Sequence, residues 1–221
     1  MKNNYLKDLP KYEELIKSQP KVINSDFEPV VVKNVFTQEE IDDIIFQMDN
    51  TPKDKRRVQS WGGQVCFDNI QLSNSIQSKI TDLMNSNLKE EFVLQQYTIV
   101  RYDNKHGYLA KLFPHYDTRP CEMFVFDAQL KTNEDWGIVV EGQQFNLNDN
   151  EALIFAGTQQ MHWREKKDLP MTTEINMIFF WFTHKEIKLK KEGHEKIMKE
   201  REAILMNETN IFSNVVTIGD E

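Results

Sequence analysis

Residues 114–117 read Pro-His-Tyr-Asp and residues 161–164 read Met-His-Trp-Arg, and these two stretches decide how the chain is interpreted. Together they place His115, Asp117 and His162 in the order His-x-Asp…His. Two neutral imidazoles and one carboxylate can occupy one face of an octahedral Fe(II) and leave the opposite face open. The long separation between Asp117 and His162 fits a β-barrel in which a later strand returns to the same ion. We therefore predict that these three side chains are metal ligands.

The His-x-Asp pattern is a weak signal when taken alone. The chain has 35 Asp and Glu in 221 residues, so a histidine with an acid two places on often arises by chance. The alternative interpretation is therefore that His115 is an ordinary loop histidine beside an aspartate. The surrounding sequence distinguishes this interpretation from a metal ligand.

The surrounding sequence is typical of a β-rich domain. Short apolar runs alternate with turn residues such as Glu141-Gly142, which predicts a sandwich or jelly roll. The predicted strands cover residues 30–32, 91–102, 121–130, 136–141, 144–147, 152–155 and 174–182.

Two amphipathic helices are predicted ahead of most of these strands. The first spans residues 38–49, because Thr37 and Glu40 form a capping-box pattern before apolar residues at helical spacing. The second spans residues 74–89, with Ile76, Ile80, Leu83 and Leu88 as its predicted buried side chains. Residues 52–73 between them are predicted to be a loop, and the basic and aromatic stretch 56–63 is a candidate lid.

Several motifs carry a resemblance to a known family. Val100-Arg101-Tyr102, Gly107, residues 114–117, the turn and strand at 148–155, and residues 161–164 together resemble the Fe(II)- and 2-oxoglutarate-dependent dioxygenases, in their prolyl-hydroxylase-like branch. The resemblance covers roughly residues 28–183. It implies a mainly β fold with flanking helices, a double-stranded β-helix or jelly roll. In that fold the first His and the Asp follow one strand, and the second His lies on a strand near the end of the roll.

The resemblance also implies an activity and a division of the chain. We expect an enzyme that uses Fe(II), O₂ and 2-oxoglutarate as co-substrate to hydroxylate an unactivated C–H, with release of succinate and CO₂. The carboxylate of Asp117 favours hydroxylation over halogenation. Residues 28–183 would form this oxygenase domain, residues 1–27 a polar and partly helical segment, and residues 184–221 a charged C-terminal helix and tail.

The far carboxylate of 2-oxoglutarate needs a cation, and here the chain departs from the family. Members usually carry a basic residue on the strand after the second His, whereas residues 174–182 contain neither Lys nor Arg. If residues 161–165 are extended, Arg164 faces inward with His162 and replaces that residue. We expect the Tyr102 hydroxyl and Thr173 to assist it.

Each of these residues has an alternative role. Arg164 could form a salt bridge with Glu165, Glu174 or Asp149, and Tyr102 could be an ordinary core residue. Two further functions therefore stay open, a metal-binding jelly roll of the cupin type that does not use 2-oxoglutarate, and a non-catalytic module with a degenerate site.

The amino-acid composition predicts which partners the protein binds and in which cellular compartment it lies. The formal charge of −8 argues against broad binding to nucleic acid or to an anionic membrane surface. Only 2 cysteines are present, which favours a reducing, cytoplasmic location. We recognise neither a signal peptide in residues 1–21 nor an apolar run of the ~18 residues that a membrane span needs. We expect a small-molecule or peptidyl substrate, and the oligomeric state stays open.

Overall fold

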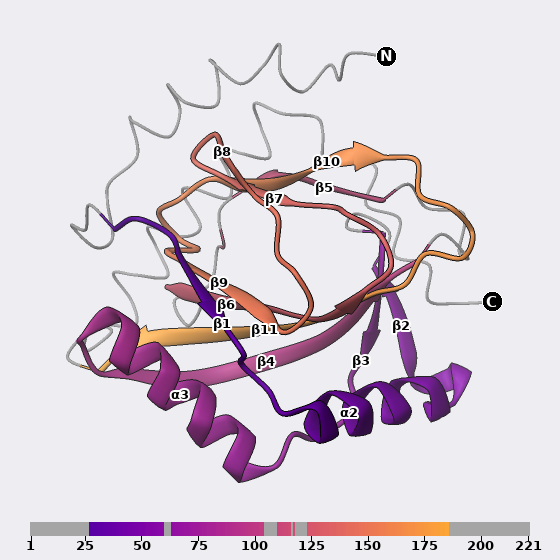
Figure 1. Cartoon of the computed structure of the whole chain (residues 1–221), viewed down its shortest axis with the longest axis horizontal. Coiled ribbons are helices and arrows are strands. Elements are labelled where there is room, and N and C mark those ends of the chain that lie inside the picture. The colour runs from indigo at the N-terminus through magenta and orange to yellow at the C-terminus, as the bar shows by residue number, and fades with distance from the viewer. Residues whose placement is uncertain (1–26, 60–62, 104–109, 116, 118–122, 186–221) are drawn as a thin grey trace.

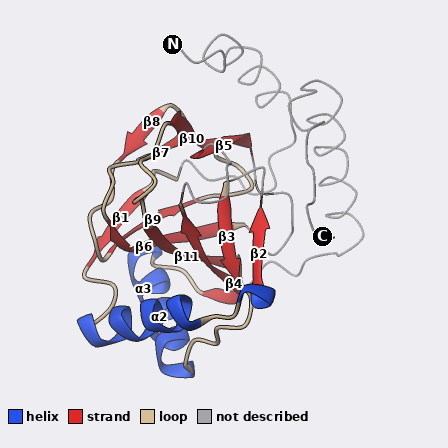
Figure 2. Ribbon diagram, turned by 90° about the vertical axis from the view of Figure 1, so that its right-hand side faces the viewer, coloured by secondary structure: helices blue, strands red, loops and turns tan. Residues whose placement is uncertain are grey.

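The structure, a computed structural model, describes residues 27–59, 63–103, 110–115, 117 and 123–185. In this part of the chain a smaller β-sheet lies over one face of a larger one, and helices cover the other face (Figures 1 and 2). This arrangement confirms the predicted mainly β fold, a double-stranded β-helix or jelly roll with flanking helices. The predicted N-terminal segment (residues 1–27) and the predicted C-terminal helix and tail (residues 184–221) lie almost wholly outside the described residues.

Strands that are distant in the sequence are neighbours in both sheets. The 7-stranded sheet contains, in spatial order, β1 (Val30–Lys33), β9 (Glu151–Phe155), β6 (Phe124–Thr132), β11 (Ile175–His184), β4 (Phe92–Tyr102), β3 (Gln64–Phe67) and β2 (Arg56–Gln59). The 4-stranded sheet contains β5 (Ala110–His115), β10 (His162–Lys167), β7 (Ile138–Val140) and β8 (Gln143–Phe145). Because β10 pairs with β5, the second half of the chain is brought back beside the His-x-Asp stretch.

Both predicted helices are present. Helix α2 (Gln38–Asn50) begins with the predicted capping box, in which the Thr37 amide donates to Glu40 Oε2 at 2.8 Å and the Glu40 amide donates to Thr37 Oγ1 at 3.2 Å. Helix α3 (Asn74–Leu88) buries Ile76, Ile80 and Met84. The predicted core positions Leu83 and Leu88 are only partly buried. Leu83 lies beside the stripe that Ile76, Ile80 and Met84 form at a spacing of four, and Leu88 is the last residue of the helix.

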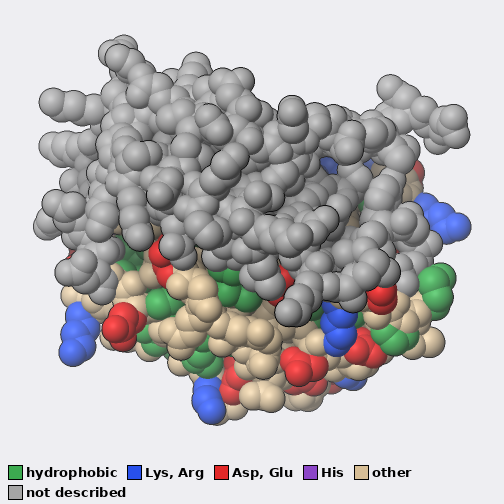
Figure 3. Space-filling view, turned by 90° about the horizontal axis from the view of Figure 1, so that it is seen from above, with side chains coloured by type: hydrophobic (Ala, Val, Ile, Leu, Met, Phe, Trp, Pro, Cys, Tyr) green, Lys and Arg blue, Asp and Glu red, His purple; other side chains and the backbone are tan. Residues whose placement is uncertain are grey.

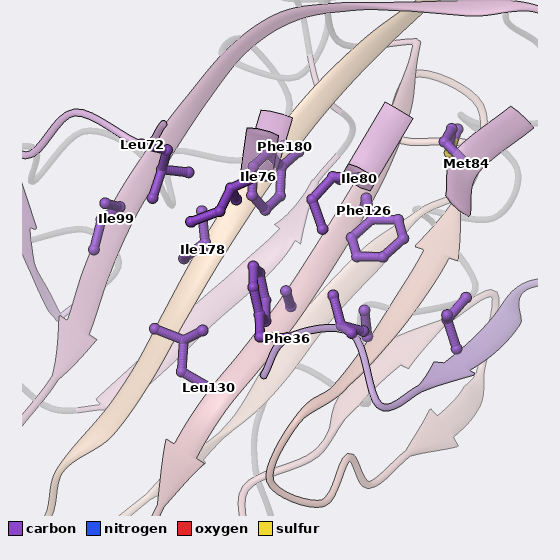
Figure 4. Close-up of a cluster of buried hydrophobic side chains, with 14 of the residues drawn as sticks. Phe36, Leu72, Ile76, Ile80, Met84, Ile99, Phe126, Leu130, Ile178 and Phe180 are labelled. Carbon is purple, nitrogen blue, oxygen red and sulfur yellow. The ribbon is translucent and has the colours of Figure 1, made fainter. Parts of the chain in front are cut away.

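The main apolar core lies between these helices and the larger sheet. Figure 4 shows side chains from α3 meeting Phe126, Ile178 and Phe180 of the central strands. Alternate residues of the same strands point the other way and pack between the two sheets, where a second cluster contains Val125, Ile138, Val140, Leu153 and Phe155. The central strands are therefore buried on both faces, which explains their nearly continuous apolar sequences.

The predicted loop at residues 52–73 is wrong in part. It contains the short 3₁₀ helix η1 (Lys53–Lys55) and the antiparallel strands β2 and β3. Strand β3 adds to the edge of β4, with Gln64 opposite Tyr102, and this long-range pairing leaves no trace in the local sequence. The candidate lid at residues 56–63 belongs to this hairpin, and its tip at residues 60–62 lies outside the described residues.

The surface charges and the helices can be compared with the predicted lack of binding to nucleic acid and membranes. Acidic and basic side chains are interspersed along the coloured part of the face in Figure 3. No helix among the described residues combines the length and apolarity that a membrane crossing requires.

Candidate metal centre

The ends of two adjacent strands of the smaller sheet position the candidate ligands. His115 is the last residue of β5, His162 is the first residue of β10, and the two are directly opposite in the antiparallel pairing. Asp117 follows β5, and its backbone amide donates to the carbonyl oxygen of Gly157 at 2.9 Å, which ties it to the loop before β10. The three side chains that were predicted from the sequence pattern therefore meet at one end of the smaller sheet.

Their donor atoms lie close enough for a shared metal ion. Asp117 Oδ1 is 3.9 Å from His115 Nε2 and 3.9 Å from His162 Nε2, and one donor atom from each residue lies within 4.8 Å of the others. Adjacent ligands of an octahedral ion with bonds of about 2.1 Å are about 3 Å apart. Modest side-chain movements would therefore close the set around an ion, and two imidazoles with one carboxylate are a donor set suited to Fe(II).

His162 is held in the form that a metal requires. Its Nδ1–H donates to the carbonyl oxygen of Gln160 at 3.0 Å, so the lone pair of Nε2 is directed toward Asp117. Burial, together with the nearby His115, lowers the pKa of His162 well below its usual value. The imidazole is therefore neutral at physiological pH. Its ring packs against Phe155 at a centroid distance of 4.6 Å, which limits its rotation.

Arg164 lies two residues beyond His162 and is buried between the sheets, as the sequence predicted. Its guanidinium donates to the carbonyl oxygen of Trp136, lies 5.2 Å from the centroid of the Trp136 ring, and lies 5.8 Å from the centroid of the Tyr102 ring. Its ionic partner is Asp127 of β6, with Nη2 3.3 Å from Oδ2.

The three salt-bridge partners considered for Arg164 are therefore wrong. Side chains alternate across a strand, and Glu165 accordingly turns away from Arg164 and accepts a hydrogen bond from Trp163 Nε1 at 2.8 Å. From the sequence, Asp127 was missed as the partner of Arg164. A carboxylate within an otherwise apolar strand is the feature that could have indicated it. Trp136 and Trp163 are both buried, and Trp136 packs among Val100, Tyr102 and Met177.

Tyr102 and Thr173 have buried hydroxyl groups. Both side chains are 0 % exposed, and neither hydroxyl has a hydrogen-bond partner in the structure as described. Tyr102 packs edge-on against Trp136, and burial raises the pKa of Tyr102, so the hydroxyl keeps its proton. Thr173 precedes Ile175, which pairs with Tyr102 across β11 and β4. An unsatisfied buried hydroxyl costs about 1–3 kcal/mol, so each of the two groups can gain from a hydrogen bond to a polar ligand.

Arg101, Lys111 and Arg119 are other basic residues near the predicted site in the sequence. Arg101 lies on the helix side of the larger sheet, where its Nε donates to Asn176 Oδ1 at 2.6 Å and its Nη2 lies 2.8 Å from Asp49 Oδ1. It is therefore a structural residue. Arg119 and the side chain of Lys111 lie outside the described part of the chain.

Comparison with known proteins gives a consistent result for the fold. No protein-family model matches the sequence, and no curated protein matches it. A viral collagen prolyl hydroxylase from Paramecium Bursaria Chlorella virus-1, solved as a 2-oxoglutarate complex, superposes with a TM-score of 0.50 at 13% identity, over 71% of this chain and 96% of that one. The α-ketoglutarate-dependent epimerase SnoN from nogalamycin biosynthesis superposes with a TM-score of 0.56 at 11% identity, over 80% and 84%.

A third solved structure is that of HygX from Streptomyces hygroscopicus with nickel, 2-oxoglutarate and hygromycin B bound. It superposes with a TM-score of 0.51 at 9% identity, over 72% of this chain and 83% of that one. At these identities the similarity concerns the fold. The chain has the fold shared by 2-oxoglutarate-dependent oxygenases, prolyl hydroxylases among them.

Proposed function

We propose that this chain, which has the fold of the Fe(II)- and 2-oxoglutarate-dependent oxygenases, is an enzyme of that kind and hydroxylates an unactivated C–H bond. The observation that carries the proposal is the convergence of His115, Asp117 and His162 within 4.8 Å at one end of the smaller sheet. A fold alone supports many functions, whereas this set of donors on this fold points to one type of chemistry.

The bound ion and two of its three proposed ligands have distinct tasks. Bound Fe(II) would supply the redox chemistry that couples decarboxylation of 2-oxoglutarate, yielding succinate and CO₂, to oxidation of the substrate by O₂. His162 offers a neutral Nε2 because Gln160 holds the proton on Nδ1. Asp117 supplies the negative charge, and the hydrogen bond from its backbone N–H to the carbonyl oxygen of Gly157 holds its position. Ligands on one face of the ion leave room for a co-substrate on the other.

We propose Arg164, Tyr102 and Thr173 as the binding site for the far carboxylate of 2-oxoglutarate. Residues two apart on a strand are separated by about 6.6 Å, so Arg164 lies at a depth below His162 that a five-carbon diacid can bridge. A guanidinium is the side chain best suited to a carboxylate, and the free Tyr102 and Thr173 hydroxyls can donate to the same group.

The substrate belongs to the class of small molecules or peptidyl side chains. The neighbours in fold include a collagen prolyl hydroxylase and a structure with hygromycin B bound, which represent both classes. The excess of acidic over basic residues argues against nucleic acid.

An anaerobic titration tests the proposal. Fe(II) and 2-oxoglutarate are added to the protein, and the weak visible absorption of the chelate is followed. The absorption is expected with the wild type and is expected to be absent with Asp117→Ala. Iron-dependent formation of succinate in air is the second measurement. A chain that gave neither signal would exclude the proposed activity.

The second candidate is a metal-binding jelly roll of the cupin type that does not use 2-oxoglutarate. The observation that favours it is the pairing of Arg164 with Asp127, because the charge proposed for the co-substrate already has a partner. Iron binding by the wild type, without the chelate absorption on addition of 2-oxoglutarate, would support this second function.

A further inference from the structure

The Asp127–Arg164 pair is unusual in its surroundings. The two side chains are 3% and 2% exposed, they lie between the sheets, and Arg164 is two residues from a candidate metal ligand. Only one oxygen of Asp127 faces Arg164, at 3.3 Å, and the other oxygen, Oδ1, has no hydrogen-bond partner in the described structure. The charges of the pair therefore balance, but one oxygen of the carboxylate lacks a hydrogen bond.

We propose that Asp127 controls the binding of the far carboxylate of 2-oxoglutarate at Arg164 by taking up a proton when that carboxylate enters. The inference rests on the proposed function, because it concerns the same co-substrate. It assigns Asp127 the role of a positioning residue that acts through Arg164 and does not touch the reacting atoms.

Charge balance provides the first argument. An incoming carboxylate would be the second negative group beside a single guanidinium in a site away from water. Two carboxylates that share one site cannot both remain ionised at low cost, so one of them takes up a proton. Asp127 is the one that is already difficult to ionise, because burial raises its pKa to about 6 in spite of Arg164. A protonated Asp127 also becomes a hydrogen-bond donor.

Among the described groups that surround Asp127, Asp127 itself is the one we expect to take up the proton. Arg164 faces it from β10. Tyr102 faces it from β4 and keeps its proton, because burial raises the pKa of its hydroxyl. Cys66 of β3 lies beyond Tyr102, and burial raises the pKa of this thiol to about 11. Strands β9 and β11 contribute Leu153 and Phe179 opposite Asp127. Two residues away from Leu153 on β9, the carboxylate of Glu151 accepts a hydrogen bond from the Asn148 amide and forms an ion pair with Lys33.

The sign of the pH dependence follows. In the free protein Asp127 is ionised above a pKa of about 6, and in the complex it is protonated. Each binding event then consumes a proton, so the affinity for 2-oxoglutarate falls about tenfold for each unit that the pH rises above this value. A 2-oxo acid without the far carboxylate brings no second charge, and its affinity should not depend on Asp127.

Calorimetry tests the inference on the intact wild-type chain. Fe(II)-loaded protein is titrated anaerobically with 2-oxoglutarate at about pH 7 and about pH 8, in two buffers of different ionisation enthalpy, which gives the number of protons taken up. About one proton is expected per 2-oxoglutarate. The matched ligand is 2-oxopentanoate, which has a methyl group in place of the far carboxylate and is expected to take up none.

An Asp127→Asn protein supplies the comparison. Its uncharged amide resembles the protonated acid, so we expect 2-oxoglutarate to bind about tenfold more tightly than to the wild type at about pH 7, with no proton uptake. Wild-type binding without proton uptake would overturn the inference and leave the proposed function intact, even if the variant failed to fold. An absence of 2-oxoglutarate binding to the iron-loaded wild type would overturn both.

Discussion

Replacing Asp117 with alanine should remove the stabilisation that a metal ion gives to the fold. Asp117 Oδ1 is 3.9 Å from each imidazole and is the one anionic donor of the three, so the variant keeps two neutral ligands that face each other across β5 and β10. The hydrogen bond from the Asp117 backbone N–H to the carbonyl oxygen of Gly157 does not depend on the side chain. The metal-free variant should therefore unfold close to the temperature of the metal-free wild type.

The size of the effect follows from binding linkage. An ion present at a hundred times its dissociation constant stabilises the folded state by about 2.7 kcal/mol. For a domain of 150–250 residues each kcal/mol raises the unfolding temperature by roughly 2–4 °C, so the wild type should gain about 5–11 °C with Fe(II). Asp117→Ala should gain less than about 2 °C at the same metal concentration, because two neutral ligands bind far more weakly.

Thermal unfolding under anaerobic conditions, with and without Fe(II), measures both values. The matched control is Asp168→Ala, which removes an exposed carboxylate outside the candidate site and should keep the full metal-dependent rise. An Asp117→Ala protein with the same rise as the wild type would refute the assignment of Asp117 as a ligand.

Two further predictions concern the body of the fold. Met84→Ala should lower the free energy of unfolding by about 2–5 kcal/mol in urea titration, because Met84 is 0% exposed, whereas the partly buried Leu83→Ala should cost about 1 kcal/mol. Equal losses would contradict the assignment of Met84 to the core stripe. Burial raises the pKa of Cys66 to about 11, so in a Cys121→Ser background this thiol should react with a thiol reagent slowly at neutral pH and faster only as the pH approaches that value. Rapid labelling of the native protein at neutral pH would contradict this prediction.

Local patterns in the sequence were sufficient for the elements that depend on local chemistry. The Thr37–Glu40 capping box predicted the start of α2, and both of its hydrogen bonds are present. The His-x-Asp…His order predicted the candidate metal ligands, because side-chain type and strand order alone decide which residues can meet at one ion. The approach of His162 to His115 is consistent with that prediction.

Features that depend on long-range pairing were missed. Strand β3 is held by its addition to β4, and β2 pairs with β3 in turn. The Arg- and Gly-containing sequence of residues 56–63, which includes β2, gives no strand pattern of its own. The partner of Arg164 was missed for a related reason. Asp127 approaches it only because the two sheets are stacked, whereas the sequence alone favours acidic residues closer to Arg164 along the chain.

The pairing of His115 directly with His162 has a consequence for folding. Side chains alternate between the faces of a strand, so a slip of one residue between β5 and β10 would turn one imidazole to the outside of the roll. Chains with the wrong alignment could not assemble the three donors and would bind the ion poorly. Metal present during folding should thus enrich the correctly aligned chains, and the ion would act as a template for the smaller sheet.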